Sequence, residues 1–331
     1  MINNEQALAI FEAGDRRRAE RRRFLSLAGK AGVAAGGFTL LSGCGDAGTT
    51  GGESGMPTPM PTPTATTAAT DLDILNFALN LEYLEAQFYS FAVYGTGLPP
   101  SMLTGQQTQG TVTGGKQVPF TDTVVREYAR EIAADEVAHV AFLRQVLGSV
   151  AVAMPSINID GSATGAFTAA ARAAGVVGPT GTFDPYASDE SFLLGAFIFE
   201  DVGVTAYKGA APLINNKTYL EAAAGILAAE AYHAGLVRTT LYRKGLQNPG
   251  AMLIESAGKI SDARDTLDGP GDDDQGIASP DGNVTSNIVP ADSNGLAYSR
   301  TTGQVLNIVY LSTALAGGGF FPTGVNGFIR S

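Results

Sequence analysis

Apolar residues recur every three or four positions in four long segments after residue 70, which predicts four α-helices. We expect these helices over about 71–94, about 121–148, from 188 onward, and about 217–244. Thr70 and Ser188 are N-cap residue types, and Thr70 forms a capping box with Asp73. A glycine follows the first, second and fourth segments and should end each helix. The fold class is therefore all-α, a four-helix bundle.

Charged side chains interrupt the apolar stripe of every predicted helix. The first and third helices each carry one inward carboxylate, and the second and fourth each carry an E-x-x-H pair. In chain order these residues are Glu82, Glu136, His139, Glu200, Glu230 and His233. The two halves of the chain thus repeat one pattern, which predicts a pseudo-twofold site at the centre of the bundle.

This set of side chains suits a dinuclear metal site. Residues three apart lie on one face of a helix, so each Glu and His of an E-x-x-H pair can reach the same ion. Four carboxylates and two imidazoles favour iron or manganese over zinc or copper, and the four negative charges balance two divalent ions. We therefore expect two Fe or two Mn ions. The sequence does not choose between the metals.

Two tyrosines repeat with the carboxylates, because Tyr89 follows Glu82 by seven residues and Tyr207 follows Glu200 by seven. Packing in the aromatic core is the favoured role. Hydrogen bonding to the site or redox chemistry remains the alternative. Glu85 and Asp135 neighbour the expected ligands and are interpreted as solvated or as outer partners of those ligands.

The connecting segments show weaker periodicity. Residues 95–119 form a Gly, Thr and Gln-rich insertion, and residues 150–187 form a long crossover with a short Ala-rich helix near 163–174. The extension 246–331 is rich in Gly and Asp. We interpret its acidic stretch 268–276 as a solvated loop in preference to a Ca²⁺ site. A capping box from Thr301 to Gln304 predicts a last short helix, and the extension should pack on the bundle.

Composition narrows the class further. The 331 residues can bury one sizeable core. The net charge of −11 lacks the basic footprint of a nucleic-acid-binding protein. A single cysteine excludes a disulfide framework within one chain and any site that needs several thiolates.

The N-terminal region indicates export. Residues 21–25 read RRRFL before a weakly apolar stretch, which resembles a twin-arginine signal over 1–43, with a basic leader as the alternative. Residues 41–44 read LSGC, which resembles a bacterial lipobox, so we expect lipidation of Cys44; a signal peptide cut elsewhere is the alternative. Residues 44–70 should then be a disordered tether. The expected location is the periplasmic face or the cell surface, with the protein exported across the inner membrane and anchored by lipid.

The region 71–245 resembles the ferritin-like superfamily, in which four helices hold a pair of iron or manganese ions. Within it, LNLEYLEAQFY at 79–89 is similar to bacterial and plant desiccation-related proteins, as are VLNIVY at 305–310 and GGFFPTGVNG at 318–327. This resemblance implies a ferritin-like four-helix bundle and a stress context. The insertion, tether and extension argue against a closed 24-subunit cage and leave a smaller homo-oligomer open.

The sequence is compatible with three functions. The first is a redox protein that reacts with peroxide or dioxygen or oxidises Fe²⁺. The second is a protective protein of the cell envelope that uses metal for stability, and the third is metal sequestration.

Overall fold

The computed structural model describes residues 69–331, except 272, 280–284, 315 and 331. The expected export signal, Cys44 and all but the last two residues of the expected tether lie outside the described residues. No helix in the described part of the chain is both long and apolar enough to cross a membrane.

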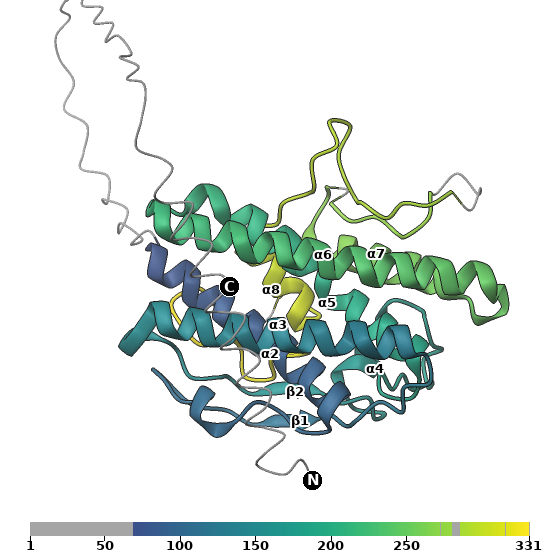
Figure 1. Ribbon diagram of the computed structural model, residues 1–331, viewed down its shortest axis with the longest axis horizontal. Helices are drawn as coiled ribbons and strands as arrows, with labels where there is room; N and C mark the ends of the chain where they lie inside the picture. Colours follow the sequence, from purple (N-terminus) through teal and green to yellow (C-terminus); the bar gives the residue numbers. More distant parts are fainter. Residues whose placement is uncertain (1–68, 272, 280–284, 315, 331) are drawn as a thin grey trace, which may run out of the picture. The chain divides into compact units, whose positions relative to one another are not determined.

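Four long helices form the bundle, as the periodicity predicted (Figure 1). They are α2 (Asp71–Tyr94), α3 (Thr123–Leu147), α5 (Asp189–Ala210) and α6 (Lys217–Gln247). Helix α2 packs along α3, and α5 packs along α6. The structure confirms the capping box of Thr70 and the N-cap of Ser188, and it shows side-chain caps from Asp122 and Asn216 as well.

The prediction that Gly245 ends the fourth helix is wrong, because α6 continues to Gln247. Gly245 is buried, and a Cβ there would lie 2.7 Å from Cγ1 of Ile254. The glycine therefore allows a close approach of the following segment and does not mark a helix end.

The insertion and the crossover pair with each other. Strand β1 (Val112–Gly114) runs parallel to β2 (Ile157–Ile159), with Val112 opposite Ile157. Three-residue strands are too short to show a period, so the sequence did not predict this pair. The predicted short helix is α4 (Ala166–Ala173). Single 3₁₀ turns complete the connections at Pro100–Met102, Gly148–Val150, Ala211–Leu213 and Pro249–Ala251.

The C-terminal extension contains a helix that sequence reasoning missed, α7 (Leu253–Asp268), before the predicted α8 (Thr302–Tyr310). The buried positions of α7 include Ser261, Arg264 and Asp268, so polar residues hid its inward stripe. Both helices contact α5, and the expected capping box of Thr301 is present.

A buried network of arginines and aspartates joins this extension to the bundle. Arg264 donates to Asp201 on α5 at 2.9 Å and to Asp274 at 2.8 Å. Arg300 donates to Asp268 and to Asp274, both at 2.7 Å, and Arg238 on α6 donates to Asp201 at 2.7 Å. The interpretation of 268–276 as a solvated loop is therefore wrong for Asp268 and Asp274, because arginines neutralise both side chains inside the protein.

The surroundings of the four helices differ. Most residues of α2 and α5 are buried, because the crossover contacts α2 and the C-terminal helices contact α5. Helices α3 and α6 each keep one exposed polar face. Solvent therefore lies closest to the bundle centre on the α3 and α6 side.

Candidate metal centre

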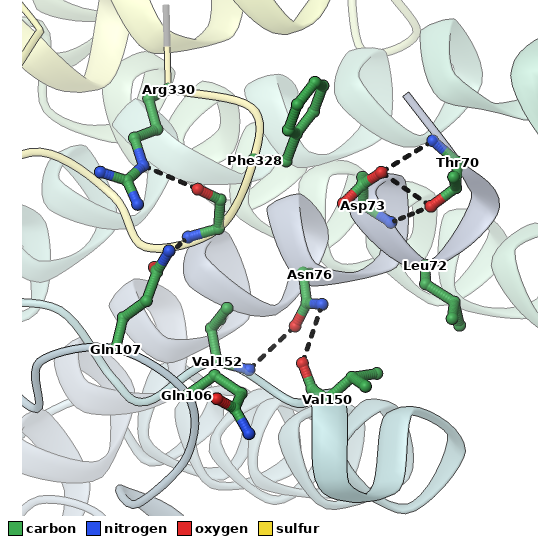
Figure 2. A pocket seen from close by; sticks show the side chains of 11 residues that line it. Thr70, Leu72, Asp73, Asn76, Gln106, Gln107, Val150, Val152, Phe328 and Arg330 are labelled. Carbon is green, nitrogen blue, oxygen red and sulfur yellow. Dashed lines mark hydrogen bonds between the residues drawn. The ribbon is translucent and has the colours of Figure 1, made fainter. Parts of the chain in front are cut away.

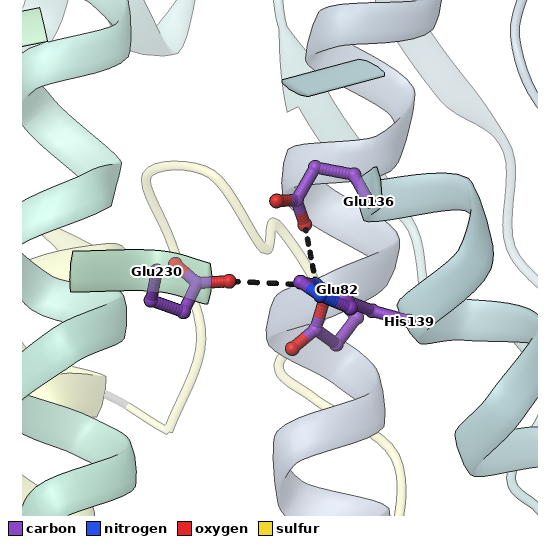
Figure 3. Close-up of side chains that lie close together, drawn as sticks. All are labelled: Glu82, Glu136, His139 and Glu230. Atoms are coloured by element: carbon purple, nitrogen blue, oxygen red, sulfur yellow. Dashed lines mark hydrogen bonds and ion pairs between the residues drawn. The ribbon is translucent and has the colours of Figure 1, made fainter. Parts of the chain in front are cut away.

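The structure brings the six predicted ligands together at the centre of the bundle. In the first half, Nδ1 of His139 lies 3.1 Å from Oε2 of Glu82, 3.5 Å from Oε2 of Glu136 and 3.5 Å from Oε1 of Glu230 (Figure 3). These four side chains come from α2, α3 and α6. They place four potential ligand atoms within 4.8 Å of one another.

The second half mirrors the first. Nδ1 of His233 lies 3.1 Å from Oε1 of Glu136 and 3.6 Å from Oε2 of Glu200. Glu200, Glu230 and His233 form a second group whose ligand atoms lie within 4.8 Å of one another. Glu136 directs one oxygen to each histidine, and Glu230 belongs to both groups, so these two carboxylates connect the two groups.

Several buried oxygen and nitrogen atoms at this centre have no hydrogen-bond partner, and this bears on whether a metal fits. Among the described residues, both carboxylate oxygens of Glu136 and of Glu230 are buried without a hydrogen bond, as are Oε2 of Glu200 and Nδ1 of His233. Burying such groups unpaired costs several kcal/mol each. Metal ions would satisfy these atoms with the oxygen and nitrogen ligands that iron and manganese accept, so the buried Glu and His cluster could hold metal.

The electrostatics fit the same picture. Burial raises the pKa of Glu82, and it raises that of Glu200 to about 8. Burial and the nearby Glu85 carboxylate raise the pKa of Glu230 well above its usual value. Burial acts in the same direction on Glu136, yet His139 and His233 outweigh it and hold its pKa below the usual range.

The pKa values of the two histidines are also raised. Burial lowers the pKa of each ring, but the carboxylates outweigh burial and raise the pKa of His139 to about 11 and that of His233 to about 10. In the absence of metal, protons on these rings therefore compensate the buried carboxylates. A metal ion must displace them to bind.

Each tyrosine of the repeat contacts the opposite half of the site. The hydroxyl of Tyr89 donates to Oε1 of Glu200, and the hydroxyl of Tyr207 donates to Oε1 of Glu82. Both rings are also buried in the core. The two tyrosines thus combine core packing with a hydrogen bond that orients the outermost carboxylates, and the second oxygen of each carboxylate faces a histidine.

Two residues beside the ligands have different surroundings. Asp135 is 41% exposed and accepts a hydrogen bond from Nε2 of His233 at 3.4 Å. Glu85 is buried and not solvated; its Oε2 has no hydrogen-bond partner, and burial raises its pKa well above normal. It lies beside Gly203: a Cβ there would lie 3.5 Å from Oε1 of Glu85 and 2.4 Å from Oε2 of Glu230. The spacing in the sequence could have drawn attention to this pair. Glu85 follows Glu82 by three residues, and Gly203 takes the corresponding position in the other half, three residues after Glu200.

A cavity away from this centre lies at the N-terminal end of α2, and none of the six candidate ligands lines it (Figure 2). Its volume is 590 Å³. Asp73 is held in the Thr70 capping box, and Asn76 bonds to the backbone of Val150 and Val152. The polar groups that line this cavity therefore serve the fold.

Comparison with known proteins assigns the family. Residues 70–243 match the ferritin-like domain. The chain belongs to the ferritin-like domain family. The bundle described above is accordingly a ferritin-like helical bundle, as the sequence predicted.

Two relatives share most of their length with this chain. It is 32% identical to the desiccation-related protein PCC13-62 of Craterostigma plantagineum over 249 residues, which cover 72% of this chain and 76% of that protein. It is 29% identical to the ferritin-like catalase Nec2 of Nesocodon mauritianus over 271 residues, which cover 78% of this chain and 84% of that protein. No solved structure shows a significant match.

Proposed function

We propose that this protein holds two manganese or iron ions and disproportionates hydrogen peroxide, so that two H₂O₂ give two H₂O and one O₂. The arrangement of Glu136 carries the proposal, because each of its unsatisfied oxygens points to a different histidine within 3.5 Å. The similarity to a protein named as a ferritin-like catalase supports peroxide as the substrate.

The six clustered side chains would hold the ions. Glu82 and His139 would serve one position, Glu200 and His233 the other, and Glu136 and Glu230 would serve both. Two such ions would supply the two-electron change that peroxide oxidation and reduction each require. Ligands on four helices keep this set rigid during turnover.

The surrounding residues have separate tasks. Tyr89 and Tyr207 fix the orientation of the outermost carboxylates through their hydroxyl groups. Burial raises the pKa of Glu85 well above its usual value and so favours its protonated form; its unpartnered Oε2 would pass a proton to a peroxide oxygen when peroxide is reduced and take one back when peroxide is oxidised. The nearly complete burial of the carboxylates excludes bulk water.

Peroxide would enter from the side of α3 and α6. The side chain of His139 is 12% exposed, whereas those of Glu82 and Glu136 are 2% and 0% exposed. On the opposite side, most residues of α2 and α5 are buried under the rest of the chain.

Metal analysis combined with oxygen evolution tests this function. We expect close to two Mn or Fe ions per chain and release of O₂ from peroxide. His139→Ala combined with His233→Ala should lose both. Less than about half an ion per chain, or a filled site that is inert to peroxide, would refute the proposal. Oxidation of added Fe²⁺ is measured in parallel, because a protein that oxidises Fe²⁺ but leaves peroxide intact has a different substrate.

A second candidate is a protective protein of the cell envelope that uses the metal for stability or sequestration. The similarity to a protein named as desiccation-related favours it. Survival of dried cells that carry the double histidine variant separates the two functions. Full protection by this variant supports the structural role, whereas loss of protection together with oxygen evolution supports the redox role.

We further propose that the protein is exported by the twin-arginine route and anchored at the membrane through lipid on Cys44. The residues RRRFL and LSGC support this proposal. Labelled palmitate should appear on the wild-type chain and be absent from Cys44→Ala. A label that is missing from the wild type, or that persists in the variant, would contradict the anchor.

A further inference from the structure

The two halves of the metal centre repeat each other closely, but they differ at the position that precedes each E-x-x-H pair. Asp135 precedes Glu136 in α3, whereas Ala229 precedes Glu230 in α6. Both positions are partly exposed, so their different side chains do not follow from different burial.

Asp135 contacts the histidine of the opposite half. Its Oδ2 lies 3.4 Å from Nε2 of His233, while Nδ1 of the same ring faces Glu136 and Glu200. When Asp135 accepts a hydrogen bond from Nε2, the proton of the ring is held on Nε2, and Nδ1 stays free for a metal. This hydrogen bond also fixes the plane of the ring and increases the basicity of Nδ1.

His139 lacks this support. Its Nδ1 faces the carboxylates in the same way, but no described residue accepts a hydrogen bond from its Nε2. The pseudo-symmetric position is Ala229, whose methyl group cannot accept one. The His139 side chain is also more exposed than that of His233, at 12% against 4%.

We propose that the two metal positions are inequivalent, and that Asp135 makes the position of His233 and Glu200 the tighter one. The first ion then occupies this position, and the second ion, beside His139 and Glu82, exchanges more readily. This inference depends on the dinuclear site proposed above. Asp135 acts here as a positioning residue, because it contacts His233 and not the ion.

Titration of the full, chelator-stripped chain with Mn²⁺ tests the inequivalence, with free Mn²⁺ followed by its electron paramagnetic resonance signal. The wild type should bind two ions in steps separated by at least about 10-fold. Asp135→Ala should weaken the tighter step by about 10–100-fold and leave the weaker step nearly unchanged. Asp135→Asn, whose amide oxygen still accepts a hydrogen bond, should recover part of the loss.

Two variants complete the design. Glu131→Ala removes a carboxylate from the exposed face of the same helix without touching a ligand, so it should change neither step. Ala229→Asp supplies the missing acceptor and should tighten the weaker step, so that the two steps approach each other. If Ala229→Asp does not fold, the Asp135 variants still decide the question.

Different results overturn different proposals. Two ions bound with equal affinity by the wild type, or an equal loss in both steps for Asp135→Ala, would refute the inequivalence and leave the dinuclear site standing. A matching loss in Glu131→Ala would assign the effect to net charge and also refute the inference. Failure of the wild type to bind any Mn²⁺ or Fe²⁺ would overturn the proposed function itself.

Discussion

Replacing Gly203 with alanine should weaken metal binding at the proposed centre while leaving the bundle folded. A Cβ at this position would lie 2.4 Å from Oε2 of Glu230, although ordinary contacts begin near 3.4 Å. The Glu230 carboxylate must therefore move by about 1 Å, several times the tolerance of about 0.2 Å for metal–ligand distances. Only the end of a flexible side chain has to move, so the backbone of α5 and α6 can keep its positions.

The expected magnitude follows from the loss of one shared ligand. We expect Gly203→Ala to weaken Mn²⁺ binding by at least about 10–100-fold, the range for mutating the outer partners of metal ligands. Oxygen evolution should fall in proportion to the metal lost. The helix itself gains, because alanine in place of glycine stabilises a helix interior by about 0.5–1 kcal/mol.

Gly225→Ala is the matched control. Gly225 is an exposed glycine of α6, and a Cβ there would have no atom within 4 Å. This variant should keep its metal and gain about 0.4–1 kcal/mol in the free energy of unfolding. Bound metal is measured by elemental analysis and folding by circular dichroism. A Gly203→Ala protein that is folded and binds two ions with wild-type affinity would show that Glu230 is not a shared ligand.

Two further predictions concern stability. Arg300→Met should lower the free energy of unfolding in urea by about 3–5 kcal/mol, because it leaves the buried Asp268 carboxylate unpaired and Asp274 with only one of its two arginines. The exposed control Arg243→Met should change the free energy of unfolding by less than about 0.5 kcal/mol, and equal effects of the two variants would contradict the network. In the metal-free protein, the pKa of Glu200 is about 8 in the folded state, against an ordinary 4.5. Between pH 4.5 and pH 8 the folded state therefore binds more protons than the unfolded state, and it loses stability as the pH rises. The melting temperature of protein stripped of metal with a chelator should therefore fall from pH 6 to pH 9, and saturating Mn²⁺ should abolish this fall. A metal-free protein that is more stable at pH 9 than at pH 6 would contradict the expected direction.

The bundle and its ligands were predictable because their signals are local. The four long helices follow from period and caps, and the spacing of each E-x-x-H pair places both side chains on one face. Helix α7 was not predictable, because its buried positions are occupied by residues such as Arg264 whose partners lie elsewhere in the chain. The β1 and β2 pair depends on contacts across more than forty residues, which no local pattern contains.

In the site, too, local sequence patterns were predictable and contacts between helices were not. The six candidate ligands could be named from the repeat, but the burial of Glu85 could not, because it depends on neighbours from other helices, such as Gly203. Likewise, the contact between Asp135 and His233 joins two helices and cannot be read from either one. The departures from the repeat became informative only when the structure showed which residues face each other.

Charge balance at the centre connects metal binding to protonation. The cluster combines five buried carboxyl groups, counting Glu85, with two histidines whose raised pKa keeps them protonated when no metal is present. In the proposed dinuclear site, two divalent ions would replace these protons, because Nδ1 of each ring and the shared carboxylates must be deprotonated to bind. Glu85 differs from the others because it lies outside the six candidate ligands, and burial raises its pKa well above the usual value. Under the proposed function, the centre would therefore exchange protons for metal at the six candidate ligands, whereas the burial of Glu85 favours a proton on that carboxyl group.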